Sequence, residues 1–348
     1  MKMYTSAITA LNKDASITCV ADGEAALGLI IRKNYDIIIV DAEIPGPGLI
    51  VLLKEIISKI PKIFILVTAR PSSANGELLL DALSIGAVEC MTKPIYDSYE
   101  ENLDKIRHKI DDIINILRHR ASVGDCKGEV SGPPIETKKT PGNNNFHPEI
   151  VLIAASTGGP KALEAILSKV ERNFPVPILV VQHITSPFTG ILTQRLDNIS
   201  ELKIKVAEYG ETITEGTVYF APGGMHMRLD AENKIYFDDS PPLNGVRPAA
   251  DALFESIAED FTGTKVLALI LTGMGSDGKD GLTKLKNKKE CYCISQSERT
   301  CAAYGMPGAV AENGLADKVL DLEEIPSGIK SFNFLTAGES ITDSSAED

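Results

Sequence analysis

The stretch Glu149–Val170, EIVLIAASTGGPKALEAILSKV, decides the fold of the larger part of the chain. Its apolar residues 150–154 are typical of a strand that is buried on both faces of a parallel sheet. From Lys161 onward the apolar residues recur at helical spacing, and Pro160 suits the first helical position. The pattern therefore predicts a strand, a tight turn and a helix.

The turn between this strand and helix reads Ser156-Thr157-Gly158-Gly159. We expect it at the C-terminal edge of the sheet, beside unpaired N–H groups of the helix, which can stabilise an oxyanion. Three interpretations stay open here: Ser156 or Thr157 caps the helix, the turn binds phosphate, or Ser156 is a nucleophile. Nucleotide binding is disfavoured because the GxGxxG and GxxxxGK[ST] patterns are absent, and the turn also differs from the GxSxG of ordinary hydrolases.

The chain has 348 residues and a net charge of −13. The length favours two domains, and the charge argues against nucleic acid or an anionic membrane as the main partner. No apolar run reaches the ~18 residues that span a bilayer, and the N-terminus has no signal-peptide pattern, so we expect no membrane insertion and a cytoplasmic location. The cysteines form no disulfide framework, and Cys291 and Cys293 are interpreted as buried or edge-strand thiols rather than metal ligands.

Residues 1–117 alternate between strand and helix patterns and predict a doubly wound α/β domain. Asp41, Thr68 and Lys93 each follow an expected strand, at the sheet edge where α/β proteins bind ligands. The expected strands span 16–20, 35–40, 62–67 and 88–91, and the expected helices span 23–33, 48–59, 78–85 and 99–117.

The segments YDIIIVDAEIPG, LVTAR and MTKP resemble the receiver domain of bacterial response regulators, which has a flavodoxin-like fold. The resemblance implies that Asp41 is the phosphoacceptor, Thr68 the switch hydroxyl and Lys93 the lysine that contacts the phosphate. A receiver opens with an apolar strand that ends in an acidic pair for Mg²⁺, whereas this chain begins with a helical pattern. We therefore expect a truncated receiver-like domain with a missing first strand, and a sheet disturbed between residues 16–20 and 35–40.

Without the acidic pair we expect a poor Mg²⁺ site and weak or no phosphorylation at Asp41. Two explanations stay open for the missing strand: the start given lies inside the true gene, or the domain has become a docking module. After this domain we expect a flexible linker over 118–148, because that segment is rich in Gly, Pro and Asn. A second doubly wound, mainly parallel domain is expected over 149–335, with a hairpin-like region at 203–237, followed by an acidic disordered tail over 336–348.

Ser156, His183 and Asp277 each follow an apolar strand of the second domain. If those strands are parallel neighbours, the three side chains meet at one edge of the sheet. A histidine can then take the proton of the serine hydroxyl, and a carboxylate on the other ring nitrogen fixes the tautomer. Spacing alone leaves alternatives open: His183 as a core or surface residue, Asp277 as a turn former, and His226 as a rival base.

Six segments occur in the order found in the catalytic domain of chemotaxis protein-glutamate methylesterases, which this part of the chain resembles: IAASTGGP, VVQHI, APGGMHM, RPAADALFESIA, LTGMGSDG and QSERTCAAYGMPGAV. The resemblance implies that Ser156 is the nucleophile, His183 the base and Asp277 the orienting carboxylate. The implied oxyanion donors are the backbone amides of Thr157 and Met274. Three further residues fall in motifs near the site with no assigned chemistry: His226, Arg247 and Met306.

This resemblance implies a carboxylic ester hydrolase that removes methyl esters from glutamate side chains of methyl-accepting chemotaxis receptors and deamidates receptor glutamines. That chemistry needs no cofactor. The implied partners are the receptors, as protein substrate, and a chemotaxis histidine kinase. Two rivals stay open: a non-enzymatic signalling adaptor that docks through the receiver-like domain, and a nucleotide-binding protein that uses the turn at Ser156.

Overall fold

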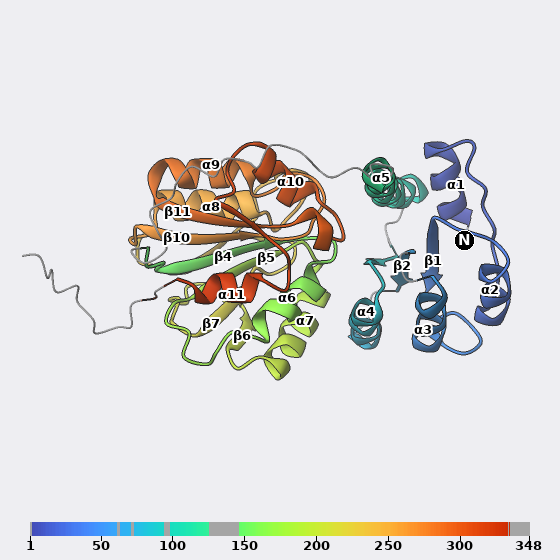
Figure 1. Ribbon diagram of the computed structural model, residues 1–348, viewed down its shortest axis with the longest axis horizontal. Coiled ribbons are helices and arrows are strands. Elements are labelled where there is room, and N and C mark those ends of the chain that lie inside the picture. Colours follow the sequence, from blue (N-terminus) through green and yellow to red (C-terminus); the bar gives the residue numbers. More distant parts are fainter. Residues whose placement is uncertain are drawn as a thin grey trace, which may run out of the picture. The chain divides into compact units, whose positions relative to one another are not determined.

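A computed structural model describes residues 2–60, 63–70, 73–93, 98–124, 146–332 and 334. The described chain falls into an N-terminal unit, which ends at Gly124, and a C-terminal unit, which begins at Phe146 (Figure 1). Most of the expected linker and all of the expected acidic tail lie outside the described residues.

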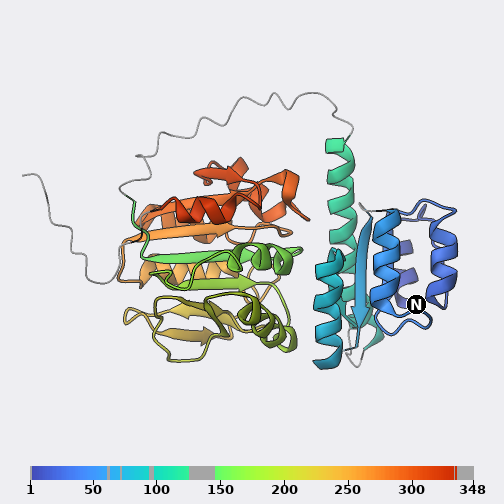
Figure 2. The ribbon, with the colours of Figure 1, turned by 60° about the horizontal axis from the view of Figure 1, so that its bottom comes forward.

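The N-terminal unit contains a three-stranded parallel sheet in the order β1-β2-β3. Helices α1 and α5 cover one face of this sheet, and α3 and α4 lie on the other (Figures 1 and 2). The face under α1 and α5 is closed by an apolar cluster that includes Ala7, Phe64 and Ile110. The elements are α1 (Lys2–Leu11), α2 (Gly23–Ile30), β1 (Ile37–Asp41), α3 (Leu49–Lys59), β2 (Phe64–Ala69), α4 (Ser73–Ile85), β3 (Glu89–Thr92) and α5 (Tyr99–Gly124).

Three predictions for the N-terminal unit are wrong in detail. Helix α4 begins at Ser73 instead of Leu78. The segment Ser16–Val20 forms no strand, because an extended segment needs a hydrogen-bonding neighbour and no described strand lies beside it. Helix α5 continues to Gly124 instead of ending at Leu117, since no Pro or Gly interrupts the sequence before that glycine.

The expected disturbance of the N-terminal sheet is confirmed. Among the described residues β1 pairs only with β2, so its other side is a free edge. A cavity of about 930 Å³ lies at that edge, and Ile17, Val20 and Ile38 are among the residues that line it. Residues 15–20, which have no regular secondary structure, and strand β1 therefore line the same cavity, and no described strand lies between them.

The C-terminal unit is built on a seven-stranded sheet in the order β12-β11-β10-β4-β5-β7-β6, with every neighbouring pair parallel. A separate antiparallel hairpin is formed by β8 and β9. The elements are β4 (Ile150–Ala155), α6 (Gly159–Leu167), β5 (Ile178–Gln182), α7 (Ser186–Ile199), β6 (Lys203–Val206), β7 (Thr217–Phe220), β8 (His226–Leu229), β9 (Ile235–Asp238), α8 (Ala250–Glu259), β10 (Lys265–Ile270), α9 (Lys279–Lys288), β11 (Glu290–Gln296), a 3₁₀ turn (Glu298–Thr300), α10 (Gly305–Glu312), β12 (Lys318–Leu320) and α11 (Ile325–Lys330).

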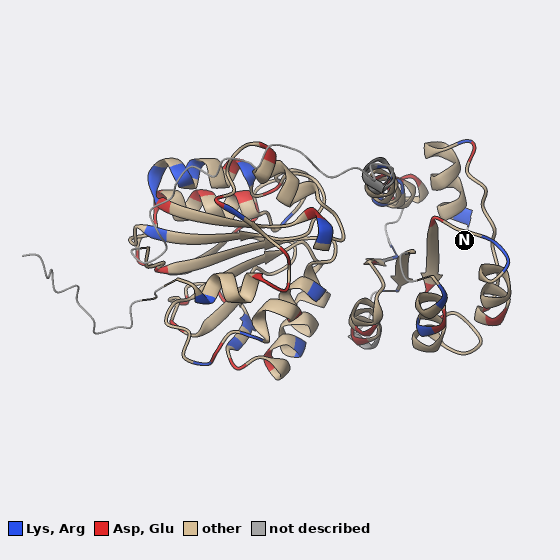
Figure 3. Ribbon diagram, in the orientation of Figure 1, with Lys and Arg blue, Asp and Glu red and all other residues tan. Residues whose placement is uncertain are grey.

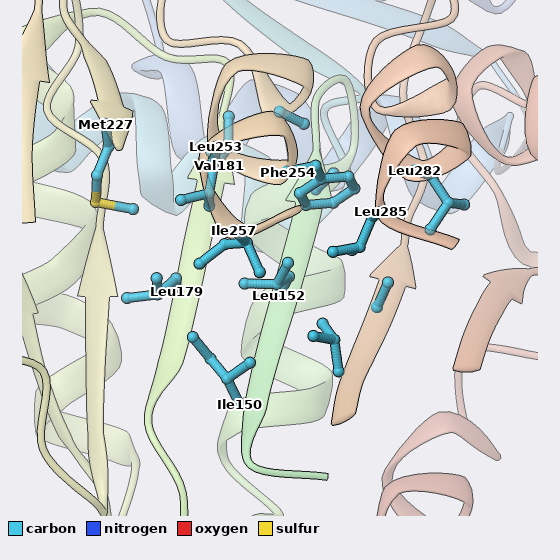
Figure 4. Close-up of a cluster of buried hydrophobic side chains, with 14 of the residues drawn as sticks. Ile150, Leu152, Leu179, Val181, Met227, Leu253, Phe254, Ile257, Leu282 and Leu285 are labelled. Carbon is cyan, nitrogen blue, oxygen red and sulfur yellow. The ribbon is translucent and has the colours of Figure 1, made fainter. Parts of the chain in front are cut away.

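Helices α8 and α9 lie on one face of this sheet, and α6, α7 and α11 lie on the other (Figure 1). Under α8 and α9, Ile150 and Leu152 of β4 pack with Leu179 of β5, Phe254 of α8 and Leu285 of α9, all fully or almost fully buried (Figure 4). Burial of each such side chain contributes about 1.5–3 kcal/mol. Strand β4 is buried along its whole length, as its apolar sequence predicts.

Charged residues are scarce along the central strands and gather on helices and loops (Figure 3). Helices α8 and α9 carry opposite charges toward each other, and Lys284 and Lys288 of α9 pair with Glu255 and Glu259 of α8. Within the described residues, no helix combines the length and the apolar character needed to cross a membrane.

The region expected to be hairpin-like, 203–237, is only partly so. Strands β6 and β7 join the main sheet in parallel, and the antiparallel pairing is confined to β8 and β9. The apolar strand β7 is buried and so belongs in the sheet core.

Candidate active site

Three polar residues follow three neighbouring strands of the C-terminal sheet. Strand β4 lies between β10 and β5, and all three strands are parallel. Ser156 follows β4, His183 follows β5, and Asp277 lies in the loop after β10. The expectation that these strands are parallel neighbours is confirmed, so the three residues share the C-terminal edge of the sheet.

His183 and Asp277 are in direct contact: His183 Nε2 lies 2.7 Å from Asp277 Oδ2. Both side chains are largely withdrawn from solvent, with exposed fractions of 9% and 1%. Asp277 Oδ2 also accepts the backbone N–H of Ala250 at 2.6 Å, and Oδ1 accepts that of Asp251 at 3.1 Å. Burial acts to raise the pKa of the Asp277 carboxyl, but His183 and these two amides outweigh it, and the pKa lies below its ordinary value.

The contact with Asp277 assigns the two ring nitrogens of His183 different roles. An ionised carboxylate only accepts hydrogen bonds, so Nε2 carries the proton and donates it to Asp277. The neutral ring therefore has its lone pair on Nδ1. That nitrogen is the one left to act as a base.

The backbone of Ser156 is held by two hydrogen bonds, one at its N–H and one at its carbonyl. Ser156 N–H donates to the carbonyl of Thr272 at 2.9 Å, and Gln182 Nε2 donates to the carbonyl of Ser156 at 2.9 Å. Gly158 has φ +79°, a left-handed conformation that favours glycine. A Cβ on Gly159 would lie 1.9 Å from Gln182 Oε1, so the close approach of Gln182 also requires glycine there.

The loop after β10 runs directly against Ser156. A Cβ on Gly273 would lie 2.8 Å from Ser156 Cβ and 2.3 Å from the sulfur of Met306, closer than real Cβ contacts. The carbonyl of Gly273 accepts the amides of Gly305 and Met306, each at 2.9 Å. This glycine therefore lets the loop that contains Met274 and Asp277 pass beside the serine.

A buried polar network behind the turn was missed by the sequence analysis. Thr272 Oγ1 donates to the carbonyl of Thr157 at 2.8 Å, and Thr272 N–H donates to Gln296 Oε1 at 2.9 Å. Gln182 and Gln296 each end a strand, at β5 and β11. His183 was predicted because it is a polar residue that follows an apolar strand. The same pattern could have identified Gln182 and Gln296, since each is a polar residue at the end of such a strand.

His226 does not have the contacts of a free base. Its side chain is fully buried, Nδ1 accepts the N–H of Ala249 at 3.1 Å, and Nε2 lies 3.3 Å from the carbonyl oxygen of Pro241. Burial lowers the pKa of His226, which keeps the ring neutral. Both ring nitrogens are thus engaged by the backbone, and the interpretation of His226 as a rival base is not supported.

Arg247 makes its described contacts with carbonyl oxygens rather than with carboxylates. Its Nη1 donates to the carbonyls of Asp239 at 2.6 Å and Ser240 at 3.0 Å. Met306 is completely buried against the loop at Gly273. Cys291 and Cys293 are free thiols, the second of them buried.

The second set of predicted residues lies in the N-terminal unit. Asp41, Thr68 and Lys93 lie at or just beyond the ends of parallel neighbours β1, β2 and β3. Lys93 Nζ lies 2.5 Å from Asp41 Oδ2, and Asp41 is directly opposite Thr68 in the strand register. Arg70 pairs with Glu43 next to this group. The three residues are therefore brought together, with Asp41 held by the lysine.

Comparisons with known proteins match this chain to methylesterases. The family model described as CheB methylesterase matches residues 151–329. A protein-glutamate methylesterase/protein-glutamine glutaminase of Halalkalibacterium halodurans is 35% identical over 332 residues, which cover 94% of this chain and 93% of the relative. A relative of the same name from Thermotoga maritima is 37% identical over 315 residues, which cover 88% of this chain and 87% of the relative.

A solved structure of a methylesterase catalytic domain is similar to the C-terminal unit. The crystal structure of the Thermotoga maritima CheB methylesterase catalytic domain matches with a TM-score of 0.50 and 44% identity, over 53% of this chain and 98% of that domain. The matched family model covers the strands that position Ser156, His183 and Asp277. The chain therefore belongs to the CheB methylesterase family.

Proposed function

We propose that the protein hydrolyses the methyl esters of glutamate side chains in methyl-accepting chemotaxis receptors and deamidates receptor glutamines, with Ser156, His183 and Asp277 as its catalytic residues. The observation that carries the proposal is the 2.7 Å bond between His183 and Asp277, on strand ends that flank the strand of Ser156. The substrate follows from the names of the relatives, which span nearly the whole chain.

The first half of the reaction forms an acyl-enzyme. His183 Nδ1 takes the proton of the Ser156 hydroxyl as Ser156 Oγ attacks the carbonyl carbon of the side-chain ester. The backbone amides of Thr157 and Met274 stabilise the resulting oxyanion. The C–OCH₃ bond then breaks, and methanol leaves with the proton from His183. With glutamine the C–NH₂ bond breaks, and ammonia leaves in the same way.

The second half regenerates the enzyme. Water attacks the acyl carbon while His183 Nδ1 takes its proton, and the same amides stabilise the second oxyanion. The bond between Ser156 Oγ and the acyl carbon breaks, Ser156 regains its proton from His183, and glutamate is released. Asp277 stays ionised throughout, because it holds the Nε2–H tautomer and stabilises the imidazolium.

The N-terminal unit is proposed as a receiver-like regulatory domain. Its support is the Asp41, Thr68 and Lys93 cluster at one sheet edge. A chemotaxis histidine kinase is the corresponding partner. Asp41 is already paired with Lys93, and the described residues contain no group of three or more His, Cys, Asp or Glu side chains that could hold a metal ion. We therefore propose weak or no control by phosphorylation.

The test is hydrolysis of methylated receptor by the parent protein, Ser156→Ala and His183→Ala, followed as release of methanol. The proposal requires activity in the parent and its loss in both variants, with unchanged melting curves. A folded parent that binds receptor but releases no methanol would instead favour the signalling adaptor.

A further inference from the structure

Two buried carboxylates cap two packed helices reciprocally beside the proposed catalytic pair. Asp277 precedes α9, but its oxygens accept the first amides of α8, those of Ala250 at 2.6 Å and Asp251 at 3.1 Å. Asp251 lies in the first turn of α8, but its Oδ1 accepts amides at the start of α9, those of Gly278 at 3.0 Å and Gly281 at 2.6 Å. Each helix thus receives its cap from the other.

Neither helix has a side-chain cap of its own. The N-cap residues are Ala249 for α8 and Gly278 for α9, and neither makes a side-chain hydrogen bond. The first amides of a helix are unsatisfied donors with a partial positive charge, so each requires an acceptor. The two carboxylates supply these acceptors and are in turn stabilised by two helix N-termini, although their exposed fractions are only 8% and 1%.

A third side chain joins the two carboxylates. Asn244 Nδ2 donates to Asp251 Oδ2 at 2.7 Å and lies 3.4 Å from Asp277 Oδ1. The helices also approach too closely for a side chain at Gly281, where a Cβ would lie 2.8 Å from the Cα of Asp251. The position of Asp277 is therefore fixed by Asp251 through the Gly278 amide, through Asn244 and through the packing of α8 on α9.

We infer that Asp251 is a positioning residue for the catalytic pair: it holds the loop of Asp277 so that the carboxylate meets His183 Nε2. The inference rests on the proposed hydrolase function. Asp251 touches neither His183 nor the reacting atoms, so its effect is exerted on the direction and strength of the bond between Asp277 and His183. An acid in the first turn of a helix is ordinarily a simple cap; here the capped helix is the one that follows the catalytic carboxylate.

The main variant is Asp251→Asn, which keeps the size of the side chain. Its amide nitrogen would face the amide of Asn244, so one of the two groups must turn away and the bridge to Asp277 is lost. We expect kcat to fall about tenfold, the size of effect usual when a group that orients a functional side chain is lost, with KM within about twofold of the parent. The downfield proton resonance of His183 Nε2–H, assigned by its loss in His183→Ala, is expected to shift.

Leu196→Ala is the matched control, because Leu196 is fully buried in α7, on the face of the sheet opposite α8 and α9 (Figure 1). It is expected to lower the melting temperature while keeping kcat and the Nε2–H resonance of the parent. Asn244→Ala, which removes only the bridging amide, provides a second test and is expected to lower kcat and shift the resonance to a smaller extent.

If Asp251→Asn lowers the melting temperature as Leu196→Ala does but leaves both kcat and the resonance unchanged, Asp251 is a structural cap and nothing more, and the inference is overturned. If Asp251→Asn does not fold, the same unchanged kcat and resonance in Asn244→Ala would overturn the inference. The resonance is measured without substrate, so a parent protein that hydrolyses no receptor would contradict the proposed function and still leave the positioning role open to this test.

Discussion

His183 Nε2 donates to Asp277 Oδ2 across 2.7 Å, although the two residues lie 94 positions apart in the sequence. The bond exists because β4 is placed between β5 and β10, so that the residues following the two outer strands flank the serine turn. It also selects Nδ1 as the basic nitrogen of the ring. This contact therefore leaves Nδ1 as the ring nitrogen available to Ser156, the proposed nucleophile.

Ser156→Ala is expected to abolish turnover without affecting the fold. The variant loses the attacking hydroxyl, which should reduce kcat by at least about 10³-fold. The hydroxyl contributes no described hydrogen bond to the packing of the turn, which is held by backbone groups, so the free energy of unfolding should change by less than about 0.5 kcal/mol. Methanol release and urea unfolding measure the two quantities. Substantial turnover in the variant would exclude Ser156 as the nucleophile.

Asp277→Asn should lose both activity and stability. An amide at this position no longer holds the required tautomer of His183, and the loss of kcat should be about 10⁴-fold. The side chain also caps α8, so the free energy of unfolding should fall by about 1–2 kcal/mol. Comparing its urea midpoint with that of Ser156→Ala separates the capping of α8 by Asp277 from its effect on His183. Equal midpoints would show that the capping contacts contribute no stability.

Gly273→Ala should be inactive and destabilised because its Cβ would collide with Ser156 and Met306. Overpacking of this kind costs about 1–3 kcal/mol and would displace the serine. Gly190→Ala is the control, since a Cβ there meets nothing within 4 Å and the residue lies inside α7. That control should stabilise the protein by about 0.5–1 kcal/mol and keep its activity. An active Gly273→Ala protein would mean that the loop is not held against Ser156.

His226 should make the stability of the protein sensitive to acid. Its pKa is lowered in the folded protein by burial, so between the unfolded value near 6.5 and the lower folded value the unfolded chain binds more protons. The contribution is fully present above about pH 6.5 and is lost as the pH falls through the folded pKa. Urea unfolding of the parent and His226→Gln at several pH values measures it. The prediction is contradicted if, below pH 6.5, the free energy of unfolding falls with pH no more steeply in the parent than in His226→Gln.

A small-molecule phosphodonor with Mg²⁺ is expected to raise methylesterase activity little or not at all. Lys93 already pairs with Asp41, and the residues described around Asp41 supply few oxygen ligands for a hard cation. The comparison is between the parent and Asp41→Asn. Strong activation of the parent that Asp41→Asn abolishes would show that phosphorylation control is intact.

The proposed catalytic residues could be predicted because each is marked by a local signal. Ser156, His183 and Asp277 follow apolar runs that become strands, and the parallel order of those strands is what unites them. Asp251 and Asn244 carry no such signal, since their relation to Asp277 depends on how α8 packs on α9. Their roles are visible only in three dimensions.

The errors in the predicted fold also arise from contacts between parts of the chain that are distant in the sequence. Residues 16–20 have the composition of a strand but no described neighbour to pair with. Strands β6 and β7 lie in a segment whose turns suggested hairpins, yet their pairing is with the main sheet. Local pattern predicted the extended conformation correctly for β6 and β7, whereas the choice of partner depended on distant parts of the chain.

The free edge of β1 bears on how the protein behaves at high concentration. Among the residues that the structure describes, no strand pairs with the outer side of Ile37–Asp41, and the first three side chains of β1 are only partly covered. An edge of this kind, without a Pro, a bulge or a lysine in the strand, is prone to pair with extended segments of other molecules and to start aggregation. Loss of soluble protein on concentration should therefore begin in the N-terminal unit, and Ile38→Lys should delay it.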